Sequence, residues 1–373
     1  MIALALACAL ALLLLAGVVG GVLPTRAPAV SGPTDIGLYQ HAIQAARHPA
    51  GYYAEIIAEQ RREGYPLRPF MTVRPPALAF LLAPLPDEGA RRLLLGALGL
   101  AVLAAWAVRL RDEGFRLLPL TVALVALSTG LMSVAATQAY AMHETWAGLL
   151  IALSLALRRP GRWGWSLAVG LLAALIRELA APYLLVMATM AFVERRPREG
   201  AAWLASLAVF VGALAAHAHA VSHYVLPNDA HSEGWLSLGG WPFLLHALQW
   251  NAVLAAGPAW LAIALAPLAL LGVTSWRGPL GARLGLIVLG YVAGLLVLGR
   301  PENVYWGLMI VPLLSLGLIK APQALLRIVL PPAAEPQAQA ASPVRRSPRP
   351  AQVRRGWRRA AHAPAPGRTA SST

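Results

Sequence analysis

Charged residues are scarce in this sequence. Asp, Glu, Lys and Arg make up 13% of the 373 residues, whereas soluble chains average about 25%. Hydrophobic residues make up 58%, and the mean hydropathy is +0.60. These values exclude an ordinary soluble domain. Several segments approach the roughly 20 apolar residues that are needed to cross a bilayer, and the alternating ten-residue strands of a membrane barrel are missing. The sequence therefore predicts an all-α protein, a polytopic bundle of membrane-spanning helices.

Cysteine is nearly absent as well. The one cysteine, Cys8, excludes a disulfide framework and a cysteine metal site. Residues 2–23 lack the basic start and the short core of a cleaved signal, so we expect them to form a retained first helix. A Walker loop, a Ser-His-Asp signature and a dinucleotide fingerprint are also missing, which leaves a nucleotide-driven pump unsupported.

The positive charge is unevenly distributed. The formal net charge is +15, and eight arginines but no acid lie between Arg345 and Arg368. Most other basic residues flank apolar segments, which is typical of cytoplasmic loops and not of a nucleic-acid-binding surface. Residues 331–373 are expected to form a disordered basic cytoplasmic tail, because they are rich in Pro, Ala and Arg and have no periodicity. We also expect four basic turns to be cytoplasmic: Arg109–Arg116, Arg158–Arg162, Arg195–Arg198 and Arg277–Arg283.

The remaining residues, 1–330, are predicted to form one transmembrane domain with ten spans. The apolar piece 77–86 is too short to cross unaided and contains Pro84 and Pro86; if it crosses, the count is eleven. The ten predicted spans are 2–23, 91–110, 117–137, 141–157, 164–176, 179–193, 201–221, one within 241–274, 280–299 and 304–320.

A long polar first loop, residues 24–76, is predicted to be extracytoplasmic. Residues 36–47 and 52–62 fit short amphipathic helices lying along the membrane interface. A second polar loop, residues 222–240, lies on the same side in this topology. Ionisable groups near membrane depth are costly and tend to mark sites. The predicted topology collects these on the extracytoplasmic face: Asp35, Arg68, Arg74, His143, Glu144, Arg177, Glu178, His223, His231, Arg300 and Glu302.

Two of these positions allow two interpretations each. Arg177-Glu178 interrupts the apolar stretch 167–193. It is either the polar turn of a helical hairpin, or it supplies a guanidinium that clamps phosphate oxygens in a bidentate manner. Asp35 fits an N-cap of a helix that starts at Ile36. A capping Asp can still present one oxygen to a substrate, so a role as general base stays open.

Other candidates are weighed in the same way. Glu144 suits the first turn of a helix, where an acid favours the helix dipole. Arg300 and Glu302 are predicted to bind substrate, because arginine is disfavoured on the non-cytoplasmic side. His219 and His223 are one helical turn apart, but no HExxH pattern accompanies them, so no metal ligands are assigned.

The layout resembles that of the GT-C superfamily of polytopic glycosyltransferases. A first helix is followed by an outer loop that opens with Thr34-Asp35 and ends in Arg74-Pro75-Pro76-Ala-Leu, similar to the family's first-loop acid and its Pro-Pro-Leu helix entry. Glu144 resembles the second acidic position. The resemblance covers roughly residues 1–320. No Asp-x-Asp pair lies near Asp35, so the resemblance leaves a divalent metal ion open as a cofactor.

The resemblance implies an inverting transfer of a sugar from a polyprenyl-phosphate donor to a glycan, lipid or protein acceptor. It places the enzyme in the bacterial inner membrane with an extracytoplasmic site, with membrane lipid as a partner and no nucleic acid. Asp35 would be the base and Glu144 a second catalytic acid. Arginines would stabilise the charge that develops on the leaving phosphate. The expected substrate-binding residues are Arg74, Arg177, Glu178, Arg300 and Glu302.

Two other classes of function compete with this one. A transporter or lipid flippase would show two similar halves with helices broken at matching positions, and the sequence shows no internal repeat. A non-catalytic assembly factor would use the arginine-rich tail to bind anionic lipid.

Overall fold

The computed structural model describes residues 35–131, 134, 136 and 138–330. Within these residues the regular secondary structure is helical and no strand occurs. The all-α prediction is therefore confirmed for this part of the chain. The predicted first helix at 2–23, the start of the first loop and the tail 331–373 lie outside the described residues.

Three helices are long and apolar enough, by length and composition, to cross a membrane. They are α5 (Glu88–Asp112), α10 (Pro197–Ser222) and α14 (Gly278–Leu298). The other predicted spans that lie within the described residues form shorter helices, so the count of ten or eleven spans stays a prediction. The shorter apolar helices after α5 are α6 (Leu117–Leu131), α7 (His143–Leu157), α8 (Gly164–Ile176), α9 (Ala181–Val193), which follows the 3₁₀ turn η5 (Glu178–Ala180), and α13 (Ala259–Ser275).

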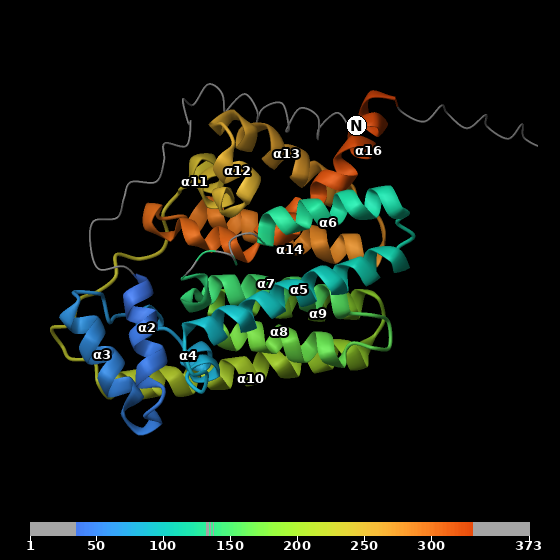
Figure 1. Cartoon of the computed structure of the whole chain (residues 1–373). Helices are drawn as coiled ribbons and strands as arrows, with labels where there is room; N and C mark the ends of the chain where they lie inside the picture. The colour runs from blue at the N-terminus through green and yellow to red at the C-terminus, as the bar shows by residue number, and fades with distance from the viewer. Residues whose placement is uncertain (1–34, 132–133, 135, 137, 331–373) are drawn as a thin grey trace, which may run out of the picture. The chain divides into compact units, whose positions relative to one another are not determined.

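The first polar loop folds into short helices that pack on one another. Both predicted helices of this loop are present, as α2 (Asp35–Ala45) and α3 (Tyr52–Arg62). The piece 77–86 forms only the six-residue helix α4 (Ala77–Leu82), preceded by the turn η2 (Phe70–Thr72). Their apolar side chains form a small core of their own, which Val221 at the end of α10 completes. Figure 1 shows α2, α3 and α4 beside this end of α10.

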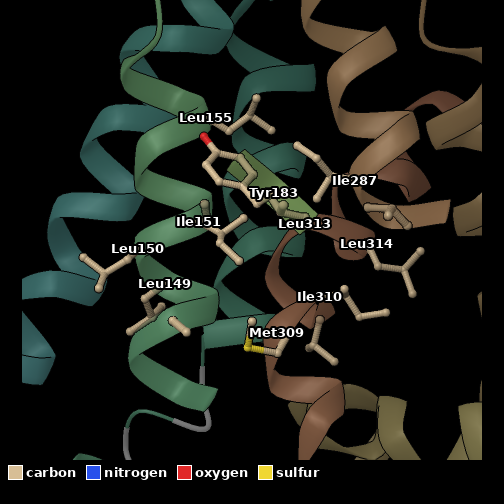
Figure 2. Packing of buried hydrophobic residues seen from close by; sticks show 14 of the residues in the cluster. Leu149, Leu150, Ile151, Leu155, Tyr183, Ile287, Met309, Ile310, Leu313 and Leu314 are labelled. Atoms are coloured by element: carbon tan, nitrogen blue, oxygen red, sulfur yellow. The ribbon is translucent and has the colours of Figure 1, made fainter. Parts of the chain in front are cut away.

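Helix α7 lies at the centre of the main core. Thirteen of its fifteen residues are buried, as expected for a helix that is apolar on all faces. It packs against α5, α8, η7 (Pro301–Met309) and α15 (Val311–Ser315). Figure 2 shows Ile151 and Leu155 of α7 close to Tyr183 of α9 and Ile287 of α14. The Ser154 hydroxyl of α7 and the Tyr183 hydroxyl form a hydrogen bond within this core, with 2.6 Å between the oxygens.

The predicted span 304–320 does not form one continuous helix, and whether it crosses a membrane stays a prediction. The chain breaks there into η7, α15 and α16 (Gly317–Val329). Pro312 cannot donate a backbone hydrogen bond to the preceding turn. Gly307 and Gly317 also bring this backbone so close to its neighbours that an added Cβ would lie 1.9 Å from the Ala247 carbonyl oxygen and 2.1 Å from that of Ala269. The segment 241–274 is also subdivided, into α11 (Gly240–Ala247), η6 (Leu248–Trp250), α12 (Ala252–Ala256) and α13.

The close crossing of α13 and α16 makes a stability prediction. A Cβ on Gly272 would lie 1.7 Å from the carbonyl oxygen of Gly317. We therefore expect Gly272→Ala to force the helices apart and to cost about 1–3 kcal/mol or more. Gly212 in α10 has nothing within 4 Å of its added Cβ, so Gly212→Ala is the matched control and should stabilise by roughly 0.5–1 kcal/mol. Unfolding of the two variants in detergent measures the difference, and equal stabilities would contradict this packing.

The four basic turns that were predicted to be cytoplasmic meet at one end of the helices. Arg158 pairs with Glu199 and Glu194 at 2.8 Å each, and Arg283 pairs with Glu194. Arg109 donates to the carbonyl oxygen of Arg158 at 2.8 Å. Three of the arginines in these turns, Arg109, Arg158 and Arg283, are therefore buried against their partners. The compartment at this end remains a prediction.

Candidate functional site

Arg74 is held by hydroxyl groups from two distant parts of the chain. It lies between η2 and α4, where Pro75 and Pro76 fix the backbone. Its Nε donates to the Tyr39 hydroxyl at 3.0 Å and its Nη2 to the Tyr305 hydroxyl at 3.3 Å. Within the described part of the chain, no carboxylate oxygen lies within 4.0 Å of its guanidinium. A part-buried arginine that has only neutral partners retains the capacity to bind an anion.

Arg177, unlike Arg74, has acidic partners. It ends α8 in an extended conformation, and Glu178 begins η5 directly after it. Its Nε lies 2.6 Å from Glu144 Oε1, and its Nη1 pairs with Glu178. The side chains of Arg177 and Glu144 are 2% and 0% exposed. The pair is thus the turn between α8 and α9 with its charges paired, and two acids already occupy the guanidinium that was predicted to clamp phosphate.

The two arginines belong to one electrostatic cluster, which we call the Arg74 cluster: Arg74, Glu144, Arg177 and Glu178. Arg74 is attracted by both acids of the cluster and repelled by Arg177. Three other buried atoms here have no hydrogen-bond partner among the described residues: Oε2 of Glu144, Oε2 of Glu178 and Nδ1 of His143. Unsatisfied buried groups are uncommon in native structures and concentrate where function requires them.

Asp35 adjoins this cluster through tyrosines. It is the first residue of α2, one residue earlier than the predicted helix start, and Thr34 lies outside the described residues. Burial raises the pKa of the Tyr65 hydroxyl, and the charge of Asp35 and a hydrogen bond with it raise this pKa further. Asp35 also acts electrostatically on Tyr39 and Tyr305, the two partners of Arg74. The charge of Asp35 therefore acts on both tyrosines that hydrogen-bond to Arg74.

Two grooves of different character border these residues. A polar groove between α2 and α3 contains Tyr65, the partner of Asp35. An apolar groove between α9 and α14 contains Leu179, which follows Glu178, and Trp306, which follows Tyr305. The polar groove is lined mainly by Gln40, His41, Gln44, Glu59 and Glu63.

Arg300 and Glu302 lie with the second polar loop instead. Arg300 pairs with Glu302, donates to the Ser232 hydroxyl at 3.2 Å and lies 4.0 Å from Glu233. No described contact joins either residue to the Arg74 cluster. Their predicted role in substrate binding therefore concerns the rim formed by this loop.

The two polar loops are fastened to each other. The Arg61 guanidinium donates to both carboxylate oxygens of Asp229, at 2.7 and 2.8 Å. The Ser232 amide donates to the Arg68 carbonyl at 2.7 Å. His231 also reaches the Arg68 side chain, with 3.5 Å between the nitrogens. The sequence-based interpretation grouped Arg68 and His231 on one face but did not foresee that they would join the loops.

The Asp229 contact predicts how acid acts on the second loop. The hydrogen bonds from Arg61 lower the pKa of Asp229 to about 2. Because this pKa lies below the unfolded value of about 3.9, the fastening is complete above pH 4 and is lost as the pH falls towards 2. We expect Asp229→Asn to loosen residues 222–240 at neutral pH already, which hydrogen exchange measures. The control is Glu233→Gln, an exposed acid in the same loop; equal exchange in both variants would contradict the fastening.

No three His, Cys, Asp or Glu side chains among the described residues are grouped as metal ligands. The Nε2 atoms of His219 and His223 lie 3.2 Å apart at the end of α10. His217 contacts the Tyr53 hydroxyl and the Val73 carbonyl, both at 3.0 Å. A divalent cofactor therefore stays open, as the sequence left it.

Comparison of the chain with protein-family models, curated proteins and solved structures finds no match. The sequence predicted no role in the site for Tyr39 or Tyr65. It indicated Tyr305 only as an aromatic residue at the membrane interface. The only sequence signal for Tyr305 was its position next to Arg300-Pro-Glu, at the entrance of a predicted helix.

Proposed function

We propose that the protein is an integral membrane glycosyltransferase of the GT-C type, which uses a polyprenyl-phosphate sugar as donor. One observation carries the proposal: Arg74 donates hydrogen bonds to Tyr39 and Tyr305 and has no acid within ion-pair distance in the described structure, while the charge of Asp35 acts on both tyrosines. This combination offers a cation for a phosphate and a carboxylate for a proton.

In the proposed reaction, Asp35 takes the proton of an acceptor hydroxyl. The acceptor oxygen attacks the anomeric carbon of the sugar, and the bond from that carbon to the phosphate oxygen breaks on the opposite side. The electron pair stays with the prenyl phosphate, whose additional negative charge Arg74 stabilises. The sugar carbon is inverted. Tyr39 and Tyr305 would hold the guanidinium in position for this step.

The two grooves support this assignment. A prenyl chain would lie in the apolar groove of α9 and α14, which begins beside Glu178 and Tyr305. An acceptor with hydroxyl groups would enter along the polar groove of α2 and α3, which leads to Tyr65 and Asp35. The donor phosphate would then be at the boundary between lipid and water, at Arg74.

We propose a secondary role for the other predicted residues. Glu144 and Glu178 would fix Arg177, whose charge would act on the phosphate at longer range and not as a direct clamp. Arg300 and Glu302 would contact the acceptor from the rim. The proposed location is the bacterial inner membrane, with ten or eleven spans and the site on the extracytoplasmic face. Three apolar helices support membrane association.

The experiment that tests Arg74 uses membranes that contain the protein, labelled prenyl-phosphate sugars and a panel of acceptors. Arg74→Gln keeps hydrogen-bond donors but removes the charge, so we expect transfer to fall by roughly 100-fold or more. Arg62→Gln is the matched control, because Arg62 is a 69% exposed arginine at the end of α3. Equal transfer by both variants would remove Arg74 from the reaction.

A transporter or flippase remains the second candidate. The observation in its favour is the break at η7, α15 and α16, since transporters bind substrates at discontinuous helices. Uptake of label into vesicles without transfer to an acceptor would favour this candidate.

A further inference from the structure

We propose that a groove at the basic end of the helices binds one anionic phospholipid, of the phosphatidylglycerol type. The groove lies between α5 and α8, near the basic turn that follows α7. It does not touch the Arg74 cluster, and the proposal does not depend on the transfer reaction.

The walls of the groove suit an acyl chain. They are formed by small apolar side chains, Ala104, Ala105 and Val108 on α5 and Ala168 on α8. Val108 is 54% exposed, so the apolar surface is open at the side. Adjacent helices with such small side chains leave a shallow channel that a flexible chain can fill.

The polar end of the groove is built around a tight turn. The backbones of Arg159 and Arg162 exchange hydrogen bonds, at 3.2 and 3.0 Å, across Pro160 and Gly161. Gly161 has a φ of +78°, which favours glycine. The turn therefore holds both arginines at the mouth of the groove, where both contribute to its lining.

The two arginines of this turn differ in whether they can bind an anionic ligand. Arg159 is neutralised by Asp112, which it contacts at 2.7 and 3.0 Å. Arg162 is exposed and has no side-chain partner among the described residues. Counting Asp112, the mouth keeps one net positive charge, which matches the single negative charge of a phosphodiester. Arg162 presents the fork of donors that such a group needs.

Trp165 marks the level of the headgroup. It is 81% exposed and also lines the groove. Exposed indoles are enriched where lipid meets water. Ala105 precedes Asp112 by seven residues, or about 10 Å along the helix, so the apolar walls extend at least this far from the charged mouth of the groove. A phosphate without a lipid tail would leave these walls unused.

The test is native mass spectrometry of the full chain in detergent, with phosphatidylglycerol and phosphatidylcholine added in turn. The wild-type protein should retain the anionic lipid preferentially, and Arg162→Gln should reduce that preference several-fold. Arg198→Gln is the matched control, because it removes an exposed arginine from the first turn of α10, near the same basic end. Trp165→Ala should weaken retention of both lipids.

Two results would overturn the proposal. One is equal retention by the Arg162 and Arg198 variants, which would indicate general attraction to the basic end. The other is displacement of the lipid by millimolar inorganic phosphate, which would indicate a site for a free anion. Neither result concerns sugar transfer, and Arg162→Gln should transfer sugar as the wild type does.

Discussion

Replacing Asp35 with Asn is expected to abolish sugar transfer while the protein stays inserted and folded. Asn is nearly isosteric and can still hydrogen-bond to Tyr65, but it cannot accept the proton of the acceptor. A positioned general base contributes roughly 10²–10⁴-fold, so residual transfer should be at most about 1% of the wild-type rate. Initial rates with labelled donor and a saturating acceptor measure this loss.

The control for this variant is Glu55→Gln, which removes an exposed acid from the first turn of α3. Its transfer rate should equal that of the wild type. The unfolding temperature of Asp35→Asn should stay close to the wild-type value, since Asp35 forms no ion pair among the described residues. Full activity of Asp35→Asn would remove it as the base.

The second large effect concerns stability. Arg177→Met should destabilise the protein by about 3–5 kcal/mol, because it leaves the buried carboxylates of Glu144 and Glu178 without their partner. Adding Glu144→Gln to Arg177→Met should recover part of this loss, since one of the two unpaired charges disappears. Unfolding in detergent of the two single variants and the double variant gives the coupling energy.

Arg300→Met provides the comparison for this effect. Arg300 and Glu302 have side chains that are 20% and 55% exposed, and pairs of this kind contribute only about 0–1 kcal/mol. If Arg177→Met and Arg300→Met are equally stable, the buried ion cluster does not have the proposed structural importance.

The elements that the sequence predicted well are those governed by local patterns. The amphipathic period over residues 52–62 corresponds to α3 with the same bounds, and the predicted span 164–176 corresponds to α8. Pro84 and Pro86 also limited the helix in the piece 77–86 as expected. The break within 304–320 was missed because it depends on contacts of Gly307 and Gly317 with α11 and α13, far away in the sequence.

The candidate site was also predicted only in part, because its contacts join residues that are far apart in the sequence. The predicted membrane topology alone was sufficient to place four residues on one face: Asp35, Arg74, Glu144 and Arg177. It could not show which arginine would be paired, because the partners are 33 residues away for Arg177 and 231 residues away for Arg74. The sequence left Arg177 open as a phosphate clamp, but its guanidinium is paired with Glu144 and Glu178, so we propose Arg74 for this role.

The sequence also did not predict the buried charges at the basic end of the helices. Glu194 and Glu199 read as ordinary turn residues, yet they neutralise Arg158 and Arg283 in the interior. Charges in a turn are normally solvated, and only the approach of α7, α9, α10 and α14 converts these into a buried network.

The most direct test of the proposed sugar transfer uses purified protein in liposomes with a panel of radiolabelled polyprenyl-phosphate sugars. We predict that one donor is consumed, that label appears in an acceptor with inverted configuration at the sugar carbon, and that neither Asp35→Asn nor Arg74→Gln forms this product. If no donor in the panel is consumed, or if both variants form product at the wild-type rate, the Arg74 cluster is not the active site of a glycosyltransferase.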